Sequence, residues 1–265
     1  MTDAPPADGP DPRELTARLE RLVREHERLF GELSAAEQRY RRLARAVWQV
    51  EEAERRRLSR EVHDGLGQTL TALKHLLSRL FTRSCEADSP LAPDLNDALE
   101  IVTAALADAR ELSRLLRPPM LDDLGLVPAL RWLTRSLREN AGLDVDLVLR
   151  GEAVEEEDGD AERVEPDLET VVFRAVQEAL TNVLKHSASQ RAVVELEVGP
   201  RQVLLTVADS GTGFDPDATL AASTQGVGLR GLRDRVQLFG GTCRVVSAPG
   251  AGTRVELVLP RSSPD

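Results

Sequence analysis

The residues best suited to chemistry stand in one short segment, where His63, Asp64 and Gln68 fall within two turns of a predicted helix. A neutral imidazole carries a lone pair near neutral pH, so it can act as a nucleophile without a metal. The adjacent carboxylate is a candidate base, and the amide lies within reach of the same helical turns. Gly65 and Gly67 interrupt the same helix, although each glycine costs about 1 kcal/mol there relative to alanine. Bare space beside His63 is one explanation for them.

A second set of polar residues lies on the buried helix predicted for residues 168–186. Glu178 and Asn182 are four positions apart and share one face of that helix. A carboxylate and an amide supply the hard oxygen ligands that hydrated Mg²⁺ prefers. Lys185 and His186 follow about one turn later. An exposed polar stripe on an amphipathic helix is the simpler alternative.

A carboxylate followed by glycines comes directly after the strand predicted for residues 203–208. Asp209 directly follows that strand, and Gly211 and Gly213 come after it. The carboxylate can accept a hydrogen bond from an exocyclic amine such as that of adenine, while glycines let a base or ribose approach the backbone. An ordinary Asp-Ser-Gly turn explains the same residues without a ligand.

A third glycine motif opens a predicted helix that runs to Phe239. It contains Gly226, Gly228, Arg230 and Gly231. Free N–H groups at a helix N-terminus favour an anionic phosphate. The spacing alone is weak evidence, because it lacks the strand-first, acidic-residue-later context of a dinucleotide fold.

Two loops flank these motifs. Residues 214–225 contain enough small and polar side chains to act as a mobile flap over a nucleotide. Residues 250–253, ending at Thr253, form a glycine-rich turn between the last two predicted strands, and a plain hairpin turn explains them equally well.

The residues before His63 are predicted to form a disordered start followed by a coiled-coil helix. Residues 1–14 are a disordered start rich in proline and aspartate. Residues 15–57 carry a heptad pattern over about five repeats, which favours a dimeric coiled coil. His26 falls on the seam, where a polar residue that sets the register is favoured over a ligand. The seam residues are Leu15, Leu19, Leu22, His26, Leu29, Leu33, Ala36, Tyr40, Leu43, Val47 and Val50.

The segments after the heptads divide into two predicted domains. Residues 58–120 read as two antiparallel helices joined by a connection at residues 82–93, and two chains would bury their apolar stripes in a four-helix bundle. Residues 121–260 combine helices with mostly antiparallel strands, an α+β arrangement. Residues 261–265 form a tail. Within residues 121–260, a helix is predicted at residues 126–139, before the buried helix at residues 168–186. The strands of this domain are predicted at residues 143–149, 192–198, 203–208, 243–247 and 253–259.

Composition excludes several classes of function. The 265 residues carry a net charge of −11, which argues against direct binding of nucleic acid because phosphate affinity rests on lysine and arginine. Cys85 and Cys243 are too few and too far apart for a metal cluster or a disulfide framework, so a cytoplasmic setting is the default. No apolar window is long enough for a membrane span.

Together the motifs resemble sensor histidine kinases of the two-component type, specifically the nitrate-sensor and DesK-like subfamily. The resemblance covers residues 51–260, and the segment 116–126 is similar to that subfamily's link between bundle and catalytic domain. The four motifs that carry it, in this order, are residues 57–68, 177–187, 209–213 and 226–232.

The resemblance implies an N-terminal coiled coil and a dimeric four-helix phosphoacceptor bundle followed by a Bergerat-type α/β sandwich that binds ATP and Mg²⁺. His63 would attack the γ-phosphate, Asp64 would accept its proton or fix its tautomer, and Gln68 would orient a water for dephosphorylating a partner. Asn182 would hold Mg²⁺ with support from Glu178. In the nucleotide site Asp209 would select adenine, and the phosphate and lid surface would be formed by Gly211, Gly213, Gly226, Gly228, Gly231 and Thr253, with Lys185 and Arg230 competing for phosphate.

The implied function is autophosphorylation of His63 by ATP and transfer to an aspartate of a response regulator, itself expected to bind DNA. The expected partners are a second copy of the chain, the regulator and an upstream sensory partner. The input can act through a docked partner, through the bundle directly, or through a longer chain of which this is the transmitter part. We favour control through the coiled coil. Two alternatives are a non-catalytic, nucleotide-switched dimeric scaffold and an ATPase or chaperone that shares the fold.

Overall fold

A computed structural model describes residues 12–87, 89–151, 164–216 and 227–261 of the chain. It divides into two compact units, residues 1–48 and residues 49–265. The described part of the first unit belongs to α1, which runs through Pro12–Glu61. This helix begins inside the segment expected to be disordered, because the fixed φ of a proline suits the first turn of a helix. In the single chain the heptad residues from Leu19 to Val50 are exposed; Leu22, Leu29 and Leu43 are 56%, 53% and 69% exposed.

A helical hairpin forms the first part of the second unit. A π-helix, η1 (Val62–Gly67), continues into α2 (Gln68–Glu86), and α3 (Ala92–Leu116) runs back beside them. The connection is shorter than the expected residues 82–93, because Pro93 lies in the first turn of α3, where its missing N–H costs nothing. Leu106 is buried between the helices, whereas Leu73 and Leu112 are 40% and 57% exposed. The hairpin therefore leaves part of its apolar surface uncovered within one chain.

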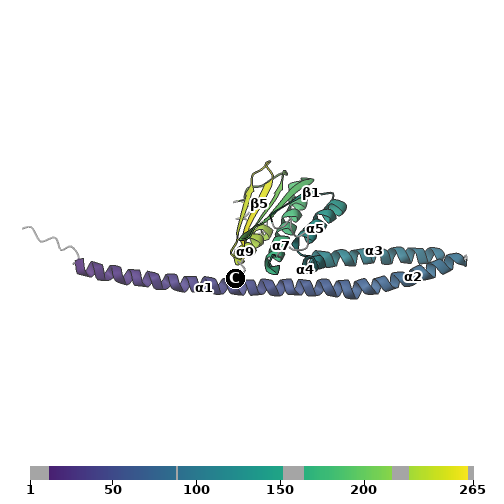
Figure 1. The fold of residues 1–265 in the computed structure, drawn as a ribbon, viewed down its shortest axis with the longest axis horizontal. Helices are drawn as coiled ribbons and strands as arrows, with labels where there is room; N and C mark the ends of the chain where they lie inside the picture. Colours follow the sequence, from purple (N-terminus) through teal and green to yellow (C-terminus); the bar gives the residue numbers. More distant parts are fainter. Residues whose placement is uncertain (1–11, 88, 152–163, 217–226, 262–265) are drawn as a thin grey trace, which may run out of the picture. The chain divides into compact units, whose positions relative to one another are not determined.

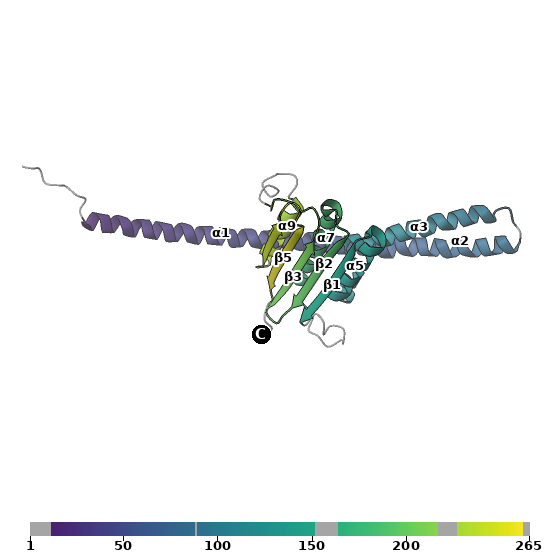
Figure 2. The same cartoon turned by 90° about the horizontal axis from the view of Figure 1, so that it is seen from above.

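A five-stranded sheet forms the rest of this unit, in the order β1-β2-β3-β5-β4. Neighbouring strands are antiparallel except for β1 and β2, which run parallel. Three helices lie along one face of the sheet (Figure 1, Figure 2). The strands are β1 (Asp144–Gly151), β2 (Arg191–Val198), β3 (Gln202–Asp209), β4 (Thr242–Ser247) and β5 (Thr253–Pro260); the helices are α5 (Leu126–Ala141), α7 (Pro166–Asn182) and α9 (Val227–Leu238), preceded by the short α4 (Pro119–Asp123).

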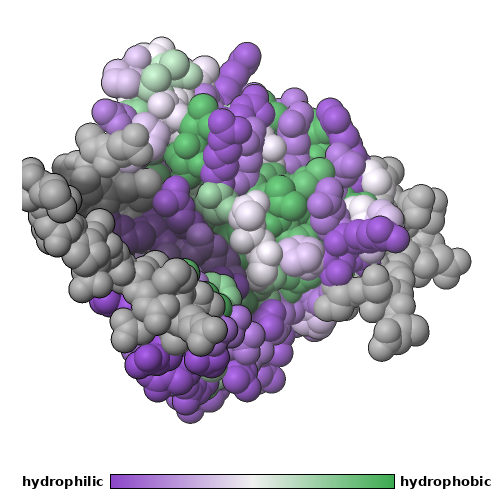
Figure 3. All heavy atoms as spheres, turned by 90° about the vertical axis from the view of Figure 1, so that its left-hand side faces the viewer, coloured by the Kyte–Doolittle hydropathy of each residue, from purple (hydrophilic) through white to green (hydrophobic). Residues whose placement is uncertain are grey.

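The core lies between the sheet and these helices. Alternate residues of the strands point into it, as Val194 and Leu196 of β2 do, and both are fully buried. Every position of α7 from Leu168 to Val176 is buried, including the charged Glu169 and Arg174. The opposite sheet face mixes polar side chains with half-exposed Val193 and Val258. Figure 3 correspondingly shows apolar patches interrupted by polar side chains on the side that it presents.

The fold class is therefore α+β with a mixed sheet, as the sequence predicts. The long buried helix ends sooner than residue 186, because α7 stops at Asn182 and passes into a π-helix, η3 (Val183–Ser187). The expected flap at residues 214–225 and the tail fall largely outside the described residues. In the described ranges no helix has both the length and the apolarity that a membrane crossing requires.

Candidate functional site

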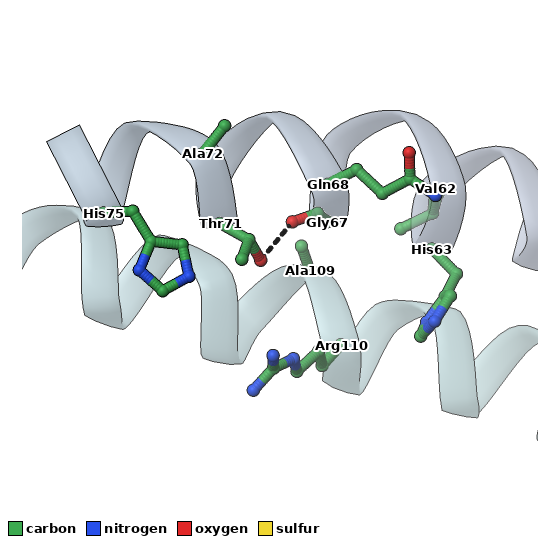
Figure 4. Close-up of a pocket in the computed structure, with 9 residues that line it drawn as sticks. All are labelled: Val62, His63, Gly67, Gln68, Thr71, Ala72, His75, Ala109 and Arg110. Carbon is green, nitrogen blue, oxygen red and sulfur yellow. Dashed lines mark hydrogen bonds between the residues drawn. The ribbon is translucent and has the colours of Figure 1, made fainter.

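His63 lies on a π-helix. The six residues of η1 interrupt the α-helical pattern without interrupting the helix itself, and such single-turn π segments are frequent at functional sites. Two threonines support the segment. Thr69 Oγ1 donates to the Gly65 carbonyl at 2.8 Å. Thr71 Oγ1 donates to the Gly67 carbonyl at 2.7 Å (Figure 4). Such bonds to the preceding turn bend helices.

The two glycines of this segment are surrounded by space. A Cβ at Gly65 would meet nothing within 4 Å, and one at Gly67 would lie 3.7 Å from the Val62 carbonyl oxygen. Alanine would therefore fit at either position. The glycines are not required by packing within the chain, which agrees with clearance for a visiting molecule as their role.

A pocket of about 350 Å³ lies beside His63. It is lined from the helix of His63 by Gln68, Thr71 and His75, and from the facing α3 by Arg110 (Figure 4). The remaining lining residues are Val62, Gly67, Ala72 and Ala109. Asp64 is exposed and is not among the described residues that line the pocket. His63 is exposed as well, so its ring is open to a phosphate donor.

One turn before His63, a buried serine pair fixes the helix to α3. Ser59 Oγ lies 3.0 Å from Ser113 Oγ and also donates to the Arg117 carbonyl at 2.7 Å. Ser113 Oγ lies 2.9 Å from the Ser59 carbonyl oxygen and can donate to it. Buried hydroxyls that are satisfied in this way define a single register between two helices. The His63 side chain is thus exposed, while the helix that carries it is held against α3.

A cleft of about 490 Å³ opens where the central strands β3 and β5 meet α7 and α9. Six of the predicted site residues line it: Glu178, Asn182, Asp209, Gly213, Gly228 and Thr253. They come from α7, the end of β3, α9 and the start of β5, so the fold brings distant motifs together. Val207 and Val255 supply an apolar floor. Apolar walls with a few converging polar groups are typical of a small-molecule site.

The polar groups of the cleft are arranged in pairs. Asn182 Nδ2 lies 3.4 Å from Glu178 Oε1, so the amide and carboxylate face the cleft together. Asp209 Oδ1 accepts the Gly211 N–H at 2.8 Å, which fixes the carboxylate and leaves its other oxygen for a ligand. Among the described residues no cluster of histidine, cysteine and acidic side chains could cage a metal. Two oxygen ligands of the Glu178–Asn182 kind fit Mg²⁺, which keeps several waters and shares its coordination with phosphate.

The glycines around the cleft are required by close packing. A Cβ at Gly211 would lie 2.1 Å from the Ser187 carbonyl oxygen, and one at Gly213 would lie 2.0 Å from the Ala248 carbonyl oxygen. Gly252, at φ +73°, would place its Cβ 2.1 Å from the Asp209 carbonyl oxygen. The loop after β3 is thereby wedged between η3 and the β4–β5 turn, which holds Asp209 in place.

Other predicted residues lie away from the cleft lining. Lys185 and Arg230 are exposed, and neither they nor Gly211 and Gly231 are among the described residues that line it. Gly226 falls outside the described residues. Their roles stay predictions. Sequence reasoning gave no role to two further residues of the lining, His186 and Phe214; His186 stands in the motif that contains Asn182, and Phe214 directly follows Gly213.

The comparisons with known proteins match both regions of the chain that contain these sites. A family model described as "Histidine kinase" matches residues 54–121, and one described as "Histidine kinase-, DNA gyrase B-, and HSP90-like ATPase" matches residues 167–263. The chain belongs to the histidine kinase family, and its pair of domains is that of the nitrate-sensor and DesK-like subfamily.

Three curated relatives extend the comparison. The chain is 33% identical to the signal transduction histidine-protein kinase/phosphatase DegS of Bacillus subtilis, over 82% of this chain and 55% of that protein. It is 34% identical to the oxygen sensor histidine kinase NreB of Staphylococcus carnosus, over 83% and 60%. It is 29% identical to the sensor histidine kinase MctS of Rhizobium johnstonii, over 88% and 49%. The chain thus spans about half the length of these relatives.

A solved structure is also similar. The histidine kinase domain from the Erythrobacter litoralis EL346 blue-light activated histidine kinase aligns with a TM-score of 0.43 at 22% identity, over 73% of this chain and 94% of that chain.

Proposed function

We propose that the protein is an ATP-dependent histidine kinase that phosphorylates His63 and passes the phosphoryl group to an aspartate of a response regulator. The observation that carries the proposal is the pairing of an exposed histidine in an open helical segment with a cleft lined by Glu178, Asn182 and Asp209 in the same chain. Relatives named as histidine kinases support it.

The chemistry follows from the residues. A ring nitrogen of His63 forms a bond to the γ-phosphorus as the bond to the bridging oxygen breaks and ADP leaves. Asp64 accepts the imidazole proton or fixes the tautomer that leaves the attacking nitrogen bare. Asp209 would hold the adenine amine. Glu178 and Asn182 would hold Mg²⁺, which when bound offsets charge on the phosphate oxygens.

A second activity is assigned to Gln68, which shares its pocket with His63. Its amide would orient a water for hydrolysis of the regulator's aspartyl phosphate. Support comes from the name of DegS, which is a kinase/phosphatase. The regulator, its DNA binding, an upstream sensory partner and the cytoplasmic location belong to the proposal as well.

The homodimer is part of the same proposal. The hairpin exposes apolar residues on both of its helical arms. These include Leu66, Leu73, Leu76, Leu80, Ile101 and Leu112. A second copy of the chain would cover them in a four-helix bundle, because antiparallel helix pairs with open apolar stripes bury them by association.

Labelling with γ-³²P ATP and Mg²⁺ tests the kinase assignment. The expected result is an acid-labile, alkali-stable label that is lost in His63→Gln and retained in the matched control His75→Gln, which alters the other histidine of the same pocket. Nucleotide binding without any label would instead support a nucleotide-switched scaffold. Steady phosphate release that persists in His63→Gln would support an ATPase.

A further inference from the structure

The pocket beside His63 contains a cation to which the proposed chemistry gives no role. Among the described residues that line this pocket, Arg110 of α3 is the one with a permanent positive charge, and none is acidic. Figure 4 shows its side chain in the stretch between His63 and His75. The whole chain has a net charge of −11, so a lining that is basic and free of carboxylates is a local exception.

Arg110 has no partner of its own. Its side chain is exposed and makes no ion pair or hydrogen bond with another described residue. A helical arginine reaches the positions three and four residues away, and on α3 none of these four positions is acidic. By contrast, Arg41 of α1 pairs with Glu37 at 2.6 Å. The guanidinium of Arg110 is therefore free to bind an anion that comes from another molecule or from a modified side chain.

The pocket stays open when a second copy of the chain covers the apolar surface of the hairpin. Thr71 lines the pocket and Leu73 belongs to the apolar surface, and the two are two residues apart on α2. Arg110 and Leu112 have the same relation on α3. Two residues correspond to about 200° around a helix. The pocket and the apolar surface thus lie on opposite sides of the hairpin, and a regulator keeps access to Arg110.

We propose that Arg110 binds the phosphoryl group that passes between His63 and the regulator. The inference rests on the proposed kinase function and names a binding residue for it. A guanidinium fits this group because its planar N–H groups meet two phosphate oxygens at once. In the transfer, an aspartate oxygen bonds to phosphorus as the N–P bond breaks and the imidazole leaves, while Arg110 stays protonated and offsets the charge on the phosphate oxygens.

Two sources present the same phosphoryl chemistry to Arg110, and the first is phospho-His63. The purified chain is incubated with Mg²⁺ and fixed ratios of ATP to ADP until the label on His63 stops changing. Arg110→Gln is expected to lower the equilibrium constant for phospho-His63 by about tenfold, the scale of one lost hydrogen bond to a charged group. A purely structural effect that slows the kinase changes the time to equilibrium and leaves its position unchanged. Arg110→Lys is expected to restore part of the loss, because it keeps the charge without the paired N–H groups.

The second source is the aspartyl phosphate of the docked regulator. Each variant is mixed with phosphorylated regulator in the absence of ATP, and the release of inorganic phosphate is followed. Arg110→Gln is expected to slow the release by about tenfold if this phosphate is the one bound. A changed equilibrium constant assigns Arg110 to phospho-His63, and slower release with an unchanged equilibrium constant assigns it to the regulator's phosphate.

Arg79→Gln is the matched control, because Arg79 is an exposed arginine of α2 outside the described lining of the pocket. It is expected to change neither measurement. Values for Arg110→Gln within about twofold of the unaltered chain in both measurements, less than a hydrogen bond to a charged group contributes, would overturn the proposal. Equal changes in Arg79→Gln would overturn it as well, because they would show a general effect of surface charge. Absence of label in the unaltered chain would instead contradict the kinase function, and the inference with it.

Discussion

The segment around His63 and the cleft beside strands β3 and β5 both use glycine, for opposite reasons. At Gly65 a Cβ would meet nothing within 4 Å, whereas at Gly252 it would lie 2.1 Å from a carbonyl oxygen. The first site keeps space open beside a reactive side chain. The second site removes side chains so that three loops can pack together. A nucleophile that visits several partners needs access, and a nucleotide site needs fixed walls.

Loss of Asn182, the proposed Mg²⁺ ligand, is expected to have the largest effect on His63 labelling. Asn182→Ala should reduce His63 labelling by about 100-fold or more, because a metal contributes several kcal/mol to stabilising charge on a transferring phosphoryl group. The measurement is the initial labelling rate at saturating ATP. Asn140→Ala is the control, since Asn140 is exposed and donates to Ser136 within α5. A rate within twofold of the unaltered protein would remove Asn182 from the site.

Alanine at the two kinds of glycine should give opposite changes in stability. Gly252→Ala is expected to lower the free energy of unfolding of the ATP-binding domain by about 2 kcal/mol or more, because φ is positive and the carbonyl of Asp209 is in the way. Gly65→Ala should raise helix stability by up to about 1 kcal/mol. Calorimetric unfolding of both variants measures the difference. Equal destabilisation by both would mean that the two regions do not differ as described.

Gln68→Ala should separate the two activities assigned to the pocket of His63. The side chain is exposed and lines that pocket, so its loss is expected to leave His63 labelling within about twofold while slowing dephosphorylation of the regulator by about tenfold or more, as for loss of a water-orienting group. The assay follows both reactions with one purified regulator. A variant with full phosphatase activity would refute the role.

The smallest expected effect is on the pH dependence of stability, through Asp122. Burial tends to raise the pKa of Asp122, but hydrogen bonds from Arg117 and Arg56 outweigh it, so the pKa of this carboxyl is lower in the folded protein than usual. A lowered folded pKa gives stability that is present above the unfolded value of about 3.9 and is lost as pH falls through the folded value. Asp122→Asn should therefore lower the melting temperature at pH 7 more than at pH 3. An equal shift at both pH values would show that these pairs do not contribute in this way.

Local patterns predicted much of this molecule. Heptads indicate the helix through Val50, and spacing of three and four indicates the hairpin and α7. Alternation indicates the strands, since side chains alternate across a sheet. These signals depend on residues close in sequence. The π-helix at His63 left only an indirect signal in Gly65 and Gly67, because a change of helical register has no periodicity of its own.

Contacts between distant residues could not be predicted from those patterns. Glu52 follows the last heptad residue, Val50, and nothing near it in the sequence shows that its partner lies 122 residues away at Arg174. The parallel pairing of β1 with β2 depends in the same way on the whole sheet. The sequence predicts a site around Asn182 but does not predict that His186 also lines the cleft. The reason is that the conformation of η3 decides which of its side chains face the cleft.

Mapping the phosphorylated residue tests the assignment of His63 most directly. His63 and His75 line the same pocket, so His75 is an internal competitor with the same chemistry. After incubation with ATP and Mg²⁺, digestion at alkaline pH and mass spectrometry should find one phosphoramidate, on His63 in the open segment. A phosphate on His75 or His186 with none on His63, or ATP turnover with no phosphohistidine at all, would contradict it.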